Sequence, residues 1–274
     1  MLEVNDYVKD YQNKGFLVID ELFSKDEVKR LTDGLETFES LKELPNIIQE
    51  NNGEIRSIFA PQEHSEAYNW LYRQERILSI LEAISGEKQY LYQFKLNNKR
   101  AFVGEAWEWH QDFPYWHLDD GVKEPKMFSV MILLQDTESY QGPLILIPQS
   151  HKNGVVEFEF KEHLLDVEND TELSLASSLG ADLKYTVKRS LIKKLINEFG
   201  TFEFKGKAGS AVIFHPNLFH ASGVNLSPYD RNTAIVTYNS VSNPPHPGEN
   251  KRPSYLCNYD SSPIEKIGKL STVN

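Results

Sequence analysis

The sequence predicts a mainly β protein, an antiparallel sandwich or jelly roll with flanking helices packed outside it. Three observations support this fold class. Apolar residues recur at helical spacing before residue 86, and from residue 90 the period changes to two, as in a strand with one buried face. Short apolar runs then alternate with turn sequences such as Gln141-Gly142-Pro143, which is typical of antiparallel β folds.

Helices dominate the first third of the chain. Gly15 and Gly86 each follow a run of helically spaced apolar residues and are expected to end it. Ser24 and Glu27 have the spacing of a capping box, in which each side chain bonds the backbone of the other. The expected elements are helices over residues 5–14 and 65–85, a helix capped by Ser24, and strands over residues 16–19 and 55–59.

The strand expected from residue 90 has two unlike faces. The residues at positions 92, 94 and 96 are apolar, whereas Gln93, Lys95 and Asn97 lie on the other face. That polar face either contacts solvent or lines a polar cavity, and the pattern favours neither. Further strands are expected at residues 126–135, 143–148, 201–205, 209–215 and 231–239.

Residues 152–200 interrupt the strands as a long insertion with an acidic middle. Apolar spacing from Leu191 to Phe199 predicts a helix that ends at Gly200. Connections of this length in compact domains are usually functional lids or disordered segments, and we expect a lid. Because no internal repeat or interdomain linker is visible, we expect one domain over residues 1–274.

Composition and charge restrict the class of partner. Aliphatic and aromatic residues make up 40% of the chain and charged residues 25%, which is the composition of an ordinary globular protein. The formal charge of -11 disfavours nucleic acid or an anionic membrane as a partner, so neither is expected. Cys257 is the single cysteine, and the first residues lack the pattern of a signal peptide, so we expect a cytoplasmic protein.

Acidic residues two positions after a histidine mark candidate metal ligands. Eight histidines and 40 acidic residues predict about one such pair by chance. One pair lies at the start of a predicted helix, where positions two apart do not share a face, and another runs into the turn Asp120-Gly121. The third ends an apparent strand, where residues i and i+2 project to the same side. These pairs are His64/Glu66, His117/Asp119 and His110/Asp112, respectively.

A third ligand is expected at His220, where a strand delivers the chain into a turn. Two histidines and one carboxylate on one face of an iron ion leave positions free for a co-substrate and oxygen. Arg231 opens the next strand, and with Ser222 it is suited to clamp a carboxylate through charge-assisted hydrogen bonds. From the residues alone, the alternative that His110, Asp112 and His220 are unrelated core or surface residues stays open.

Several motifs carry a family resemblance. The stretch from Trp107 to Gly121 reads aromatic-x-Trp-His-x-Asp-Phe-x-x-Trp-His-x-acidic-Asp-Gly. The other motifs are Gln93-x-Lys95-x-Asn97, Gly142-Pro143-Leu144 to Pro148-x-Ser150-His151, His220-x-Ser222 with Arg231, and Arg252-Pro253 to Ser262-Pro263-Ile264. Together they resemble the iron(II)- and 2-oxoglutarate-dependent dioxygenases of the phytanoyl-CoA dioxygenase superfamily, and more closely the ectoine hydroxylases and their relatives.

The resemblance implies a double-stranded β-helix, a cupin-like jelly roll with the N-terminal helices outside it. It also implies hydroxylation of an unactivated carbon, in which O2 and 2-oxoglutarate are consumed and succinate and carbon dioxide are released. A homodimer is a further expectation from these relatives. The implied roles are iron(II) ligands at His110, Asp112 and His220, 2-oxoglutarate binding by Arg231, Ser222, Gln93, Asn97 and Trp116, and pocket lining by Trp116 and Phe214.

Departures from the ectoine hydroxylase pattern fall at positions associated with substrate. Lys95 replaces an arginine, Ile235 stands where an aromatic residue is expected, and Gln111 and Pro114-Tyr115 also differ. We therefore expect a small free amino acid or a similar zwitterion as substrate, with ectoine itself or a carrier-bound or secondary-metabolite substrate as alternatives. The candidate substrate contacts are Lys95, Gln111, Tyr115, Trp116 and Phe214.

Three other functions are less well supported by the sequence. A halogenase of the same fold needs a small residue in place of the carboxylate ligand, and Asp112 argues against it. An enzyme acting on coenzyme A esters or carrier-bound substrates would favour a basic entrance, which does not suit the acidic balance. A non-catalytic metal-binding jelly roll and a zinc hydrolase both leave Arg231 without a role.

Overall fold

The computed structural model describes residues 4–50, 52–156, 158–160, 185–249 and 251–268. Its larger sheet is antiparallel and seven-stranded, in the order β1 (Phe16–Ile19), β11 (Ala211–Phe214), β6 (Met127–Leu133), β13 (Arg231–Ser240), β4 (Gln89–Lys99), β3 (Ile55–Phe59) and β2 (Ile47–Gln49). A smaller antiparallel sheet has the order β10 (Phe202–Phe204), β7 (Leu144–Leu146), β12 (His220–Ser222) and β5 (Trp107–His110).

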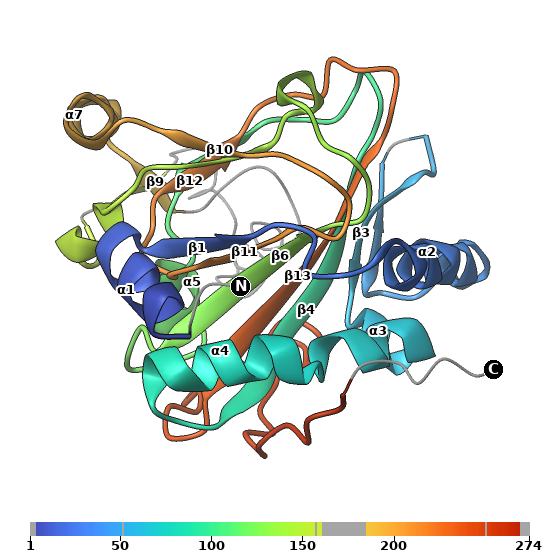
Figure 1. Cartoon of the computed structure of the whole chain (residues 1–274), viewed down its shortest axis with the longest axis horizontal. Coiled ribbons are helices and arrows are strands. Elements are labelled where there is room, and N and C mark those ends of the chain that lie inside the picture. Colours follow the sequence, from blue (N-terminus) through green and yellow to red (C-terminus); the bar gives the residue numbers. More distant parts are fainter. Residues whose placement is uncertain (1–3, 51, 157, 161–184, 250, 269–274) are drawn as a thin grey trace.

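The N-terminal helices lie against one face of the larger sheet (Figure 1). They are α1 (Val4–Lys14), α2 (Lys25–Asp33), α3 (Glu66–Tyr72) and α4 (Glu75–Ser85). The capping box that starts α2 is confirmed, because the Ser24 hydroxyl accepts from the Glu27 amide at 3.3 Å and the Glu27 carboxylate accepts from the Ser24 amide at 2.9 Å. The helix expected at residues 5–14 and the strands at 16–19 and 55–59 are confirmed as well.

The single helix expected over residues 65–85 is wrong, because the chain forms two helices there. Gln74 separates them with an extended backbone (φ -65°, ψ 121°), which a helix cannot contain. Its fully buried side chain donates to the Trp70 carbonyl at 3.1 Å and accepts from Arg76 at 2.9 Å. The C-terminal segment bridges the same point, where Ile267 accepts from the Glu75 amide at 3.0 Å. Distant contacts therefore decide this break, and apolar periodicity does not report them.

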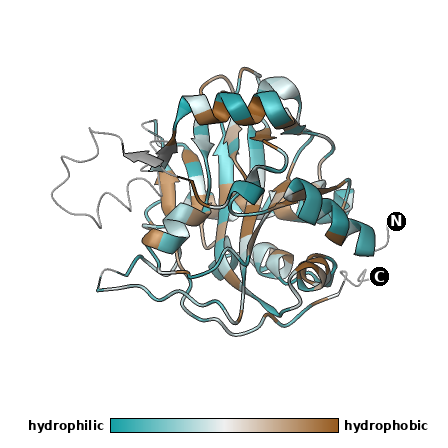
Figure 2. Cartoon of the chain, turned by 90° about the vertical axis from the view of Figure 1, so that its left-hand side faces the viewer, coloured by the Kyte–Doolittle hydropathy of each residue, from teal (hydrophilic) through white to brown (hydrophobic). Residues whose placement is uncertain are grey.

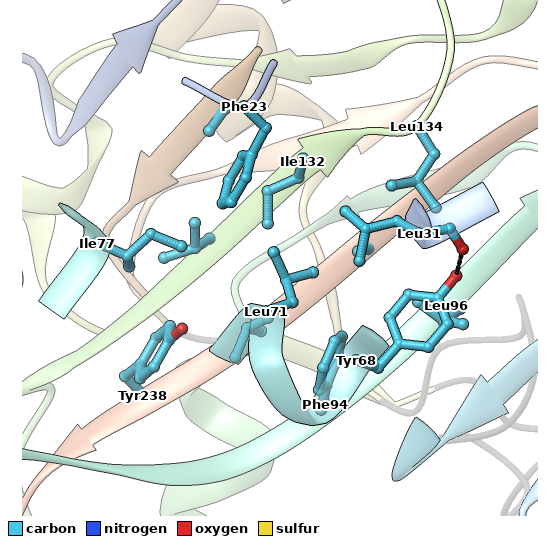
Figure 3. Packing of buried hydrophobic residues seen from close by; sticks show 14 of the residues in the cluster. Phe23, Leu31, Tyr68, Leu71, Ile77, Phe94, Leu96, Ile132, Leu134 and Tyr238 are labelled. Atoms are coloured by element: carbon cyan, nitrogen blue, oxygen red, sulfur yellow. Dashed lines mark hydrogen bonds between the residues drawn. The ribbon is translucent and has the colours of Figure 1, made fainter. Parts of the chain in front are cut away.

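The main hydrophobic core fills the space between these helices and the larger sheet. Figure 3 shows side chains such as Leu71 from α3 directed at Phe94 and Ile132 from the strands. Tyr68 is completely buried, and its hydroxyl donates to the Leu31 carbonyl at 2.7 Å, so its polar end is satisfied inside the core. Each fully buried side chain of this size contributes about 1.5–3 kcal/mol to stability through removal from water.

A second apolar layer joins the two sheets and makes the arrangement a jelly roll, as predicted. Met131 and Phe214 of the larger sheet pack with Leu146 and Phe204 of the smaller one. The strands expected at 126–135, 143–148, 201–205, 209–215 and 231–239 are all present, each within two residues of the predicted bounds. The short strands β2 and β12 were not predicted, whereas β5 corresponds to the apparent strand expected before His110.

The remaining described elements are short helices and parts of the insertion. Helix α5 (Phe113–Leu118) was not expected, whereas the turn expected around Asp120-Gly121 follows directly after it. Within the insertion, β8 (Phe158–Phe160) pairs with β9 (Tyr185–Val187), and α7 (Arg189–Phe199) confirms the helix expected before Gly200. Residues 161–184, the middle of the expected lid, lie outside the described residues, so the lid stays a prediction. The remaining short helices are η1 (Gly34–Leu41), η2 (Pro61–Glu63), η3 (Ser139–Gln141) and η4 (Ser150–Asn153).

Hydropathy follows the expected pattern for helices with one buried face. Figure 2 shows hydrophobic and hydrophilic stretches alternating along the helices. Within the described residues, no helix is both long and apolar enough to cross a membrane.

Candidate active site

The structure brings together the three predicted ligands His110, Asp112 and His220. One nitrogen of each histidine and one carboxylate oxygen of Asp112 all lie within 4.8 Å of one another. The two histidines meet because β5 and β12 are paired strands in which His110 is directly opposite His220, with ring centroids 4.1 Å apart. Strand register thus unites residues that are far apart in the sequence.

Asp112 reaches this cluster by a turn and not by strand alternation, which corrects the sequence argument. Strand β5 ends at His110, and Asp112 has helical backbone angles (φ -75°, ψ -37°) immediately before α5. The amides of Asp112 and Phe113 both donate to the Pro216 carbonyl, at 3.0 and 3.1 Å. This contact ties the start of α5 to the turn that precedes His220. The Asp112 Oδ1 atom then lies 3.8 Å from Nε2 of His110 and 3.6 Å from Nε2 of His220.

Hydrogen bonds to the outer nitrogens orient both imidazole rings. Nδ1 of His110 lies 2.7 Å from the Glu108 carbonyl, and Nδ1 of His220 lies 2.9 Å from the Leu218 carbonyl. Because a carbonyl can only accept, each Nδ1 carries the proton, and each Nε2 directs a free lone pair at the centre of the cluster. The Ser129 hydroxyl donates to Oδ2 of Asp112 at 3.2 Å and leaves Oδ1 facing the two Nε2 atoms.

The charge states of the cluster suit a divalent cation. Burial, and next the proximity of His220, lower the pKa of His110 to about 3, so its ring is neutral near pH 7. Burial acts to raise the pKa of Asp112, but His220, His110 and Lys95 together outweigh it, and the net pKa is lowered. A neutral imidazole and an ionised carboxylate are the forms that bind metal.

A cavity of about 60 Å³ adjoins the cluster, and we call it the metal-side cavity. Of the predicted substrate contacts, Lys95, Tyr115 and Trp116 line it. Trp116 is held by an edge contact with Tyr92 at 5.5 Å between ring centroids. Its remaining walls come from Gln93, Trp107, His110, Asp112, Ser129, Ile235, Thr237 and Arg252. A larger cavity of about 940 Å³ lies outside β5 and against α7, but none of the three clustered residues lines it.

Two predicted substrate contacts have other places in the structure. Gln111 is 2% exposed, and its amide nitrogen donates to the carbonyls of Gly154 and Asn217 at 2.8 and 2.7 Å. The side chain therefore joins two loops and lines neither the metal-side cavity nor the larger one, so its contact with substrate stays a prediction. Phe214 is buried, and its ring makes an edge contact with the His220 ring at 5.2 Å between centroids. It therefore packs against that histidine.

A second cavity of about 30 Å³ lies beside the first, and we call it the arginine-side cavity. Arg231 and Asn97 line it, and Trp107 lines both cavities. Arg231 is 4% exposed and donates from Nη1 to the Gly142 carbonyl at 2.6 Å, while its buried Nε has no partner among the described residues. Gln93 was grouped with Asn97, but it lines the metal-side cavity, where its amide donates to the Leu256 carbonyl at 2.7 Å.

Among the cavity-lining side chains that the sequence analysis did not single out, three have contacts that bear on function. Arg252 lines the metal-side cavity and forms a buried ion pair with Asp120, and it belongs to a recognised motif to which no role had been given. Lys99 lines the arginine-side cavity, and it continues the polar alternation of β4 two positions beyond Asn97, which was a readable signal. Ser129 lies in a wholly buried strand, and nothing in the sequence distinguishes it.

The sequence profile of the phytanoyl-CoA dioxygenase (PhyH) family matches residues 11–233. The chain belongs to the phytanoyl-CoA dioxygenase family. This confirms the resemblance and places the chain among the iron(II)- and 2-oxoglutarate-dependent dioxygenases. Because the match stops at residue 233, the expectation of one domain over residues 1–274 stays a prediction.

Relatives of this dioxygenase include enzymes that act on small molecules. It is 32% identical over 258 residues to L-proline trans-4-hydroxylase of Streptomyces griseoviridis, which covers 94% of this chain and 93% of the relative. It is 32% identical over 270 residues to ectoine dioxygenase of Streptomyces coelicolor, with 92% and 83% covered.

The crystal structure of EctD from S. alaskensis with 2-oxoglutarate and 5-hydroxyectoine is similar to this dioxygenase at 25% identity and a TM-score of 0.79. The similarity covers 96% of this chain and 86% of that one. A crystal structure of the same protein with bound Fe has a TM-score of 0.78. The predicted cupin-like double-stranded β-helix is thereby confirmed.

Proposed function

We propose that this dioxygenase hydroxylates an unactivated carbon of a small free amino acid or an amino-acid-like zwitterion. It uses iron(II) held by His110, Asp112 and His220, with 2-oxoglutarate as co-substrate and O2 as oxidant. The observation that carries the proposal is the meeting of two imidazole nitrogens and one carboxylate oxygen beside a cavity that adjoins a buried, partly unsatisfied arginine.

The donor set fits a ferrous ion. Two Nε2 atoms and one carboxylate oxygen, all on one side, are the ligands of non-haem iron oxygenases and leave coordination positions open. Iron bound there with 2-oxoglutarate supplies dioxygen activation coupled to oxidative decarboxylation of the co-substrate to succinate and carbon dioxide. The residues themselves hold the ligand atoms in place, through the carbonyls of Glu108 and Leu218 and the hydroxyl of Ser129.

The arginine-side cavity fits the distal carboxylate of 2-oxoglutarate. Arg231 is buried, and its unsatisfied Nε is a donor that a carboxylate oxygen would complete. Ser222 and Asn97 add polar groups beside it, and Trp107 lies between this cavity and the metal cluster. A five-carbon dicarboxylate with one end at the metal and the other at Arg231 would pass along Trp107.

The metal-side cavity has the lining expected for an amino acid. Lys95 and Arg252 offer positive charge to a carboxylate, while the rings of Trp116 and Tyr115 offer π faces to an ammonium group. The cavity of about 60 Å³ suits a small substrate. Because Ile235 also lines it where ectoine hydroxylases are expected to have an aromatic ring, we favour a free amino acid over ectoine.

Succinate release tests the proposal across candidate substrates. Purified protein with iron(II), 2-oxoglutarate and O2 would be incubated with each free amino acid, with ectoine and with related zwitterions. We expect succinate formation to rise strongly for one amino acid, whose product gains one oxygen atom by mass spectrometry. If only ectoine raises succinate formation, ectoine and not a free amino acid is the substrate. If none of the compounds raises it, the proposed substrate class is contradicted.

Assembly and location are separate proposals. We propose a homodimer, on the basis of the family resemblance, and a cytoplasmic location, on the basis of the acidic composition and the single buried cysteine. Light scattering of the purified protein would test the first, since a mass near 31.6 kDa would indicate a monomer.

A further inference from the structure

Exposed hydrophobic side chains gather on three connecting segments at one end of the molecule. Eight large hydrophobic side chains are exposed among the described residues, and six of them belong to loop 100–106, loop 223–230 and η3. Loop 223–230, orange in Figure 1, lies beside η3 at the top of that view. We call the six side chains the apolar patch, and they are Phe102, Val103, Tyr140, Val224, Leu226 and Tyr229.

Backbone hydrogen bonds join the three segments into one surface. The Phe102 amide donates to the Ser227 carbonyl at 3.1 Å, and the Leu226 amide donates to the Tyr140 carbonyl at 2.9 Å. Loop 223–230 therefore lies between the other two segments. The six exposed side chains thus form one patch and are not scattered over the molecule.

A buried polar side chain beneath the patch fixes the middle loop. Asn225 is completely buried, and its amide nitrogen donates to the Lys99 carbonyl at 3.0 Å and to the Tyr229 carbonyl at 2.8 Å. Its side-chain oxygen accepts from the amide and the hydroxyl of Ser227, at 2.9 and 2.7 Å. Because the loop is held in one shape before any partner binds, association costs little conformational entropy.

The size and composition of the patch match the apolar centre of a homodimer interface. With about 150–250 Å² for a large side chain, the exposed fractions of 47–68% correspond to roughly 600 Å² in total. Monomeric proteins rarely expose contiguous apolar patches larger than a few hundred Å². A stable interface buries about 800 Å² on each partner, and about 65% of a homodimer interface is apolar. The patch therefore supplies the apolar part of such an interface.

Charge favours a second copy of this chain as the partner. A two-fold interface places a surface against itself, so a centre with net charge would repel its own copy. The six patch residues are uncharged, and Arg100 and Asp230, which flank the loops, already pair with each other at 2.6 Å. The formal charge of -11 opposes contact between two copies over the acidic surfaces of the chain, and it also disfavours an anionic membrane as partner.

We propose that the apolar patch is the two-fold interface of a homodimer, centred on loop 223–230. The inference assigns a surface to the proposed homodimer, and it does not depend on the proposed hydroxylation. Glu105 and Glu138 are exposed beside the patch. Added salt should screen their repulsion across the interface and tighten the dimer, whereas salt weakens an interface that is held by ion pairs.

Sedimentation equilibrium of the purified protein tests this interface. We expect the wild type to have twice the chain mass of 31.6 kDa, with an association that strengthens as sodium chloride is added. Leu226→Asp should weaken dimerisation roughly 100-fold or more, because it places a charge in the apolar centre and occurs twice in a two-fold interface. Leu118→Asp changes an exposed leucine on α5, outside the patch, and as the matched control it should leave the dimer intact.

The outcomes separate the patch from the homodimer and from the hydroxylase. A monomeric wild type would overturn both the patch and the homodimer, and it would leave the proposed hydroxylation standing. A wild-type dimer whose dissociation constant is unchanged in Leu226→Asp would overturn the patch alone. If far-UV circular dichroism shows that Leu226→Asp does not fold, Tyr229→Ser decides the question. Weaker dimerisation of Tyr229→Ser than of Leu118→Asp supports the interface, and equal dimerisation contradicts it.

Discussion

At the scale of single residues, the three proposed ligands depend on neighbours that fix their orientation. Asp112→Ala should reduce hydroxylation to background, because it removes the only carboxylate of the cluster. The fold should survive, since Asp112 is only partly buried and lies outside the hydrophobic clusters. Far-UV circular dichroism and succinate release would be measured together. Asp136→Ala, an exposed aspartate paired with Lys207, is the control, and wild-type activity in Asp112→Ala would show that the wrong carboxylate had been chosen.

Ser129→Ala should weaken metal binding while leaving the ligands in place. The hydroxyl donates to Oδ2 of Asp112 at 3.2 Å. Removing a group that orients a metal ligand in this way typically lowers metal affinity by about 10- to 100-fold, and we expect a loss of that size here. Iron(II) or manganese(II) affinity would be measured by competition with a chelator. Unchanged affinity in a folded Ser129→Ala protein would show that Asp112 is oriented by other contacts.

His215 should make stability fall in mild acid. Burial, and next the proximity of His151, lower the pKa of His215 to about 3, below the ordinary value of about 6.5 in an unfolded chain. The unfolded state therefore binds more protons between those values, so this contribution to stability is complete above about pH 6.5 and is lost as pH falls toward 3. In urea unfolding of the metal-free protein, the free energy of unfolding should fall less steeply with decreasing pH in His215→Gln than in the wild type. The difference in slope should be up to about 1.4 kcal/mol per pH unit between about pH 6.5 and 3. An unchanged pH dependence in that variant would contradict the assignment.

At the scale of secondary-structure elements, short sequence motifs predicted a helix boundary correctly where contacts within a few residues determine that boundary. The Ser24/Glu27 pair specified the start of α2 before any contact was known. Gln74 and Asp112 show where such signals fail. The break at Gln74 depends on the C-terminal segment, and the turn into α5 depends on the Pro216 carbonyl. Long-range partners of this kind leave no mark in the local spacing of apolar residues.

Ser24→Ala should destabilise the protein by about 1 kcal/mol, the usual cost of losing a helix N-cap. The Ser24 hydroxyl accepts from the Glu27 amide, and the Glu27 carboxylate also pairs with Arg76. Urea unfolding midpoints would be compared with those of Ser40→Ala, whose hydroxyl is exposed. A loss no greater than that of the control would mean that the capping box does not contribute to global stability.

At the scale of the whole molecule, the jelly roll joins residues whose sequence positions gave only partial clues. The predicted ligand set His110, Asp112 and His220 rested on motif spacing together with the family resemblance, and pairing of β5 with β12 explains how the three residues meet. Two features were not predictable from the sequence, because both depend on which loops pack over the sheet. Gln93 and Asn97 line different cavities, and the Gln111 side chain bonds the Gly154 carbonyl. Arg252 lines the metal-side cavity and forms a buried ion pair with Asp120, a partner that local sequence spacing does not reveal.

The central claim is that one site holds both a ferrous ion and 2-oxoglutarate between the metal cluster and Arg231. Anaerobic addition of iron(II) and then 2-oxoglutarate, followed by visible absorption, tests it most directly. Chelation of iron by the 2-oxo acid gives a weak charge-transfer band, and we expect this band in the wild type and its loss in Asp112→Ala. A folded wild-type protein that binds iron(II) and shows no band with saturating 2-oxoglutarate would contradict the account.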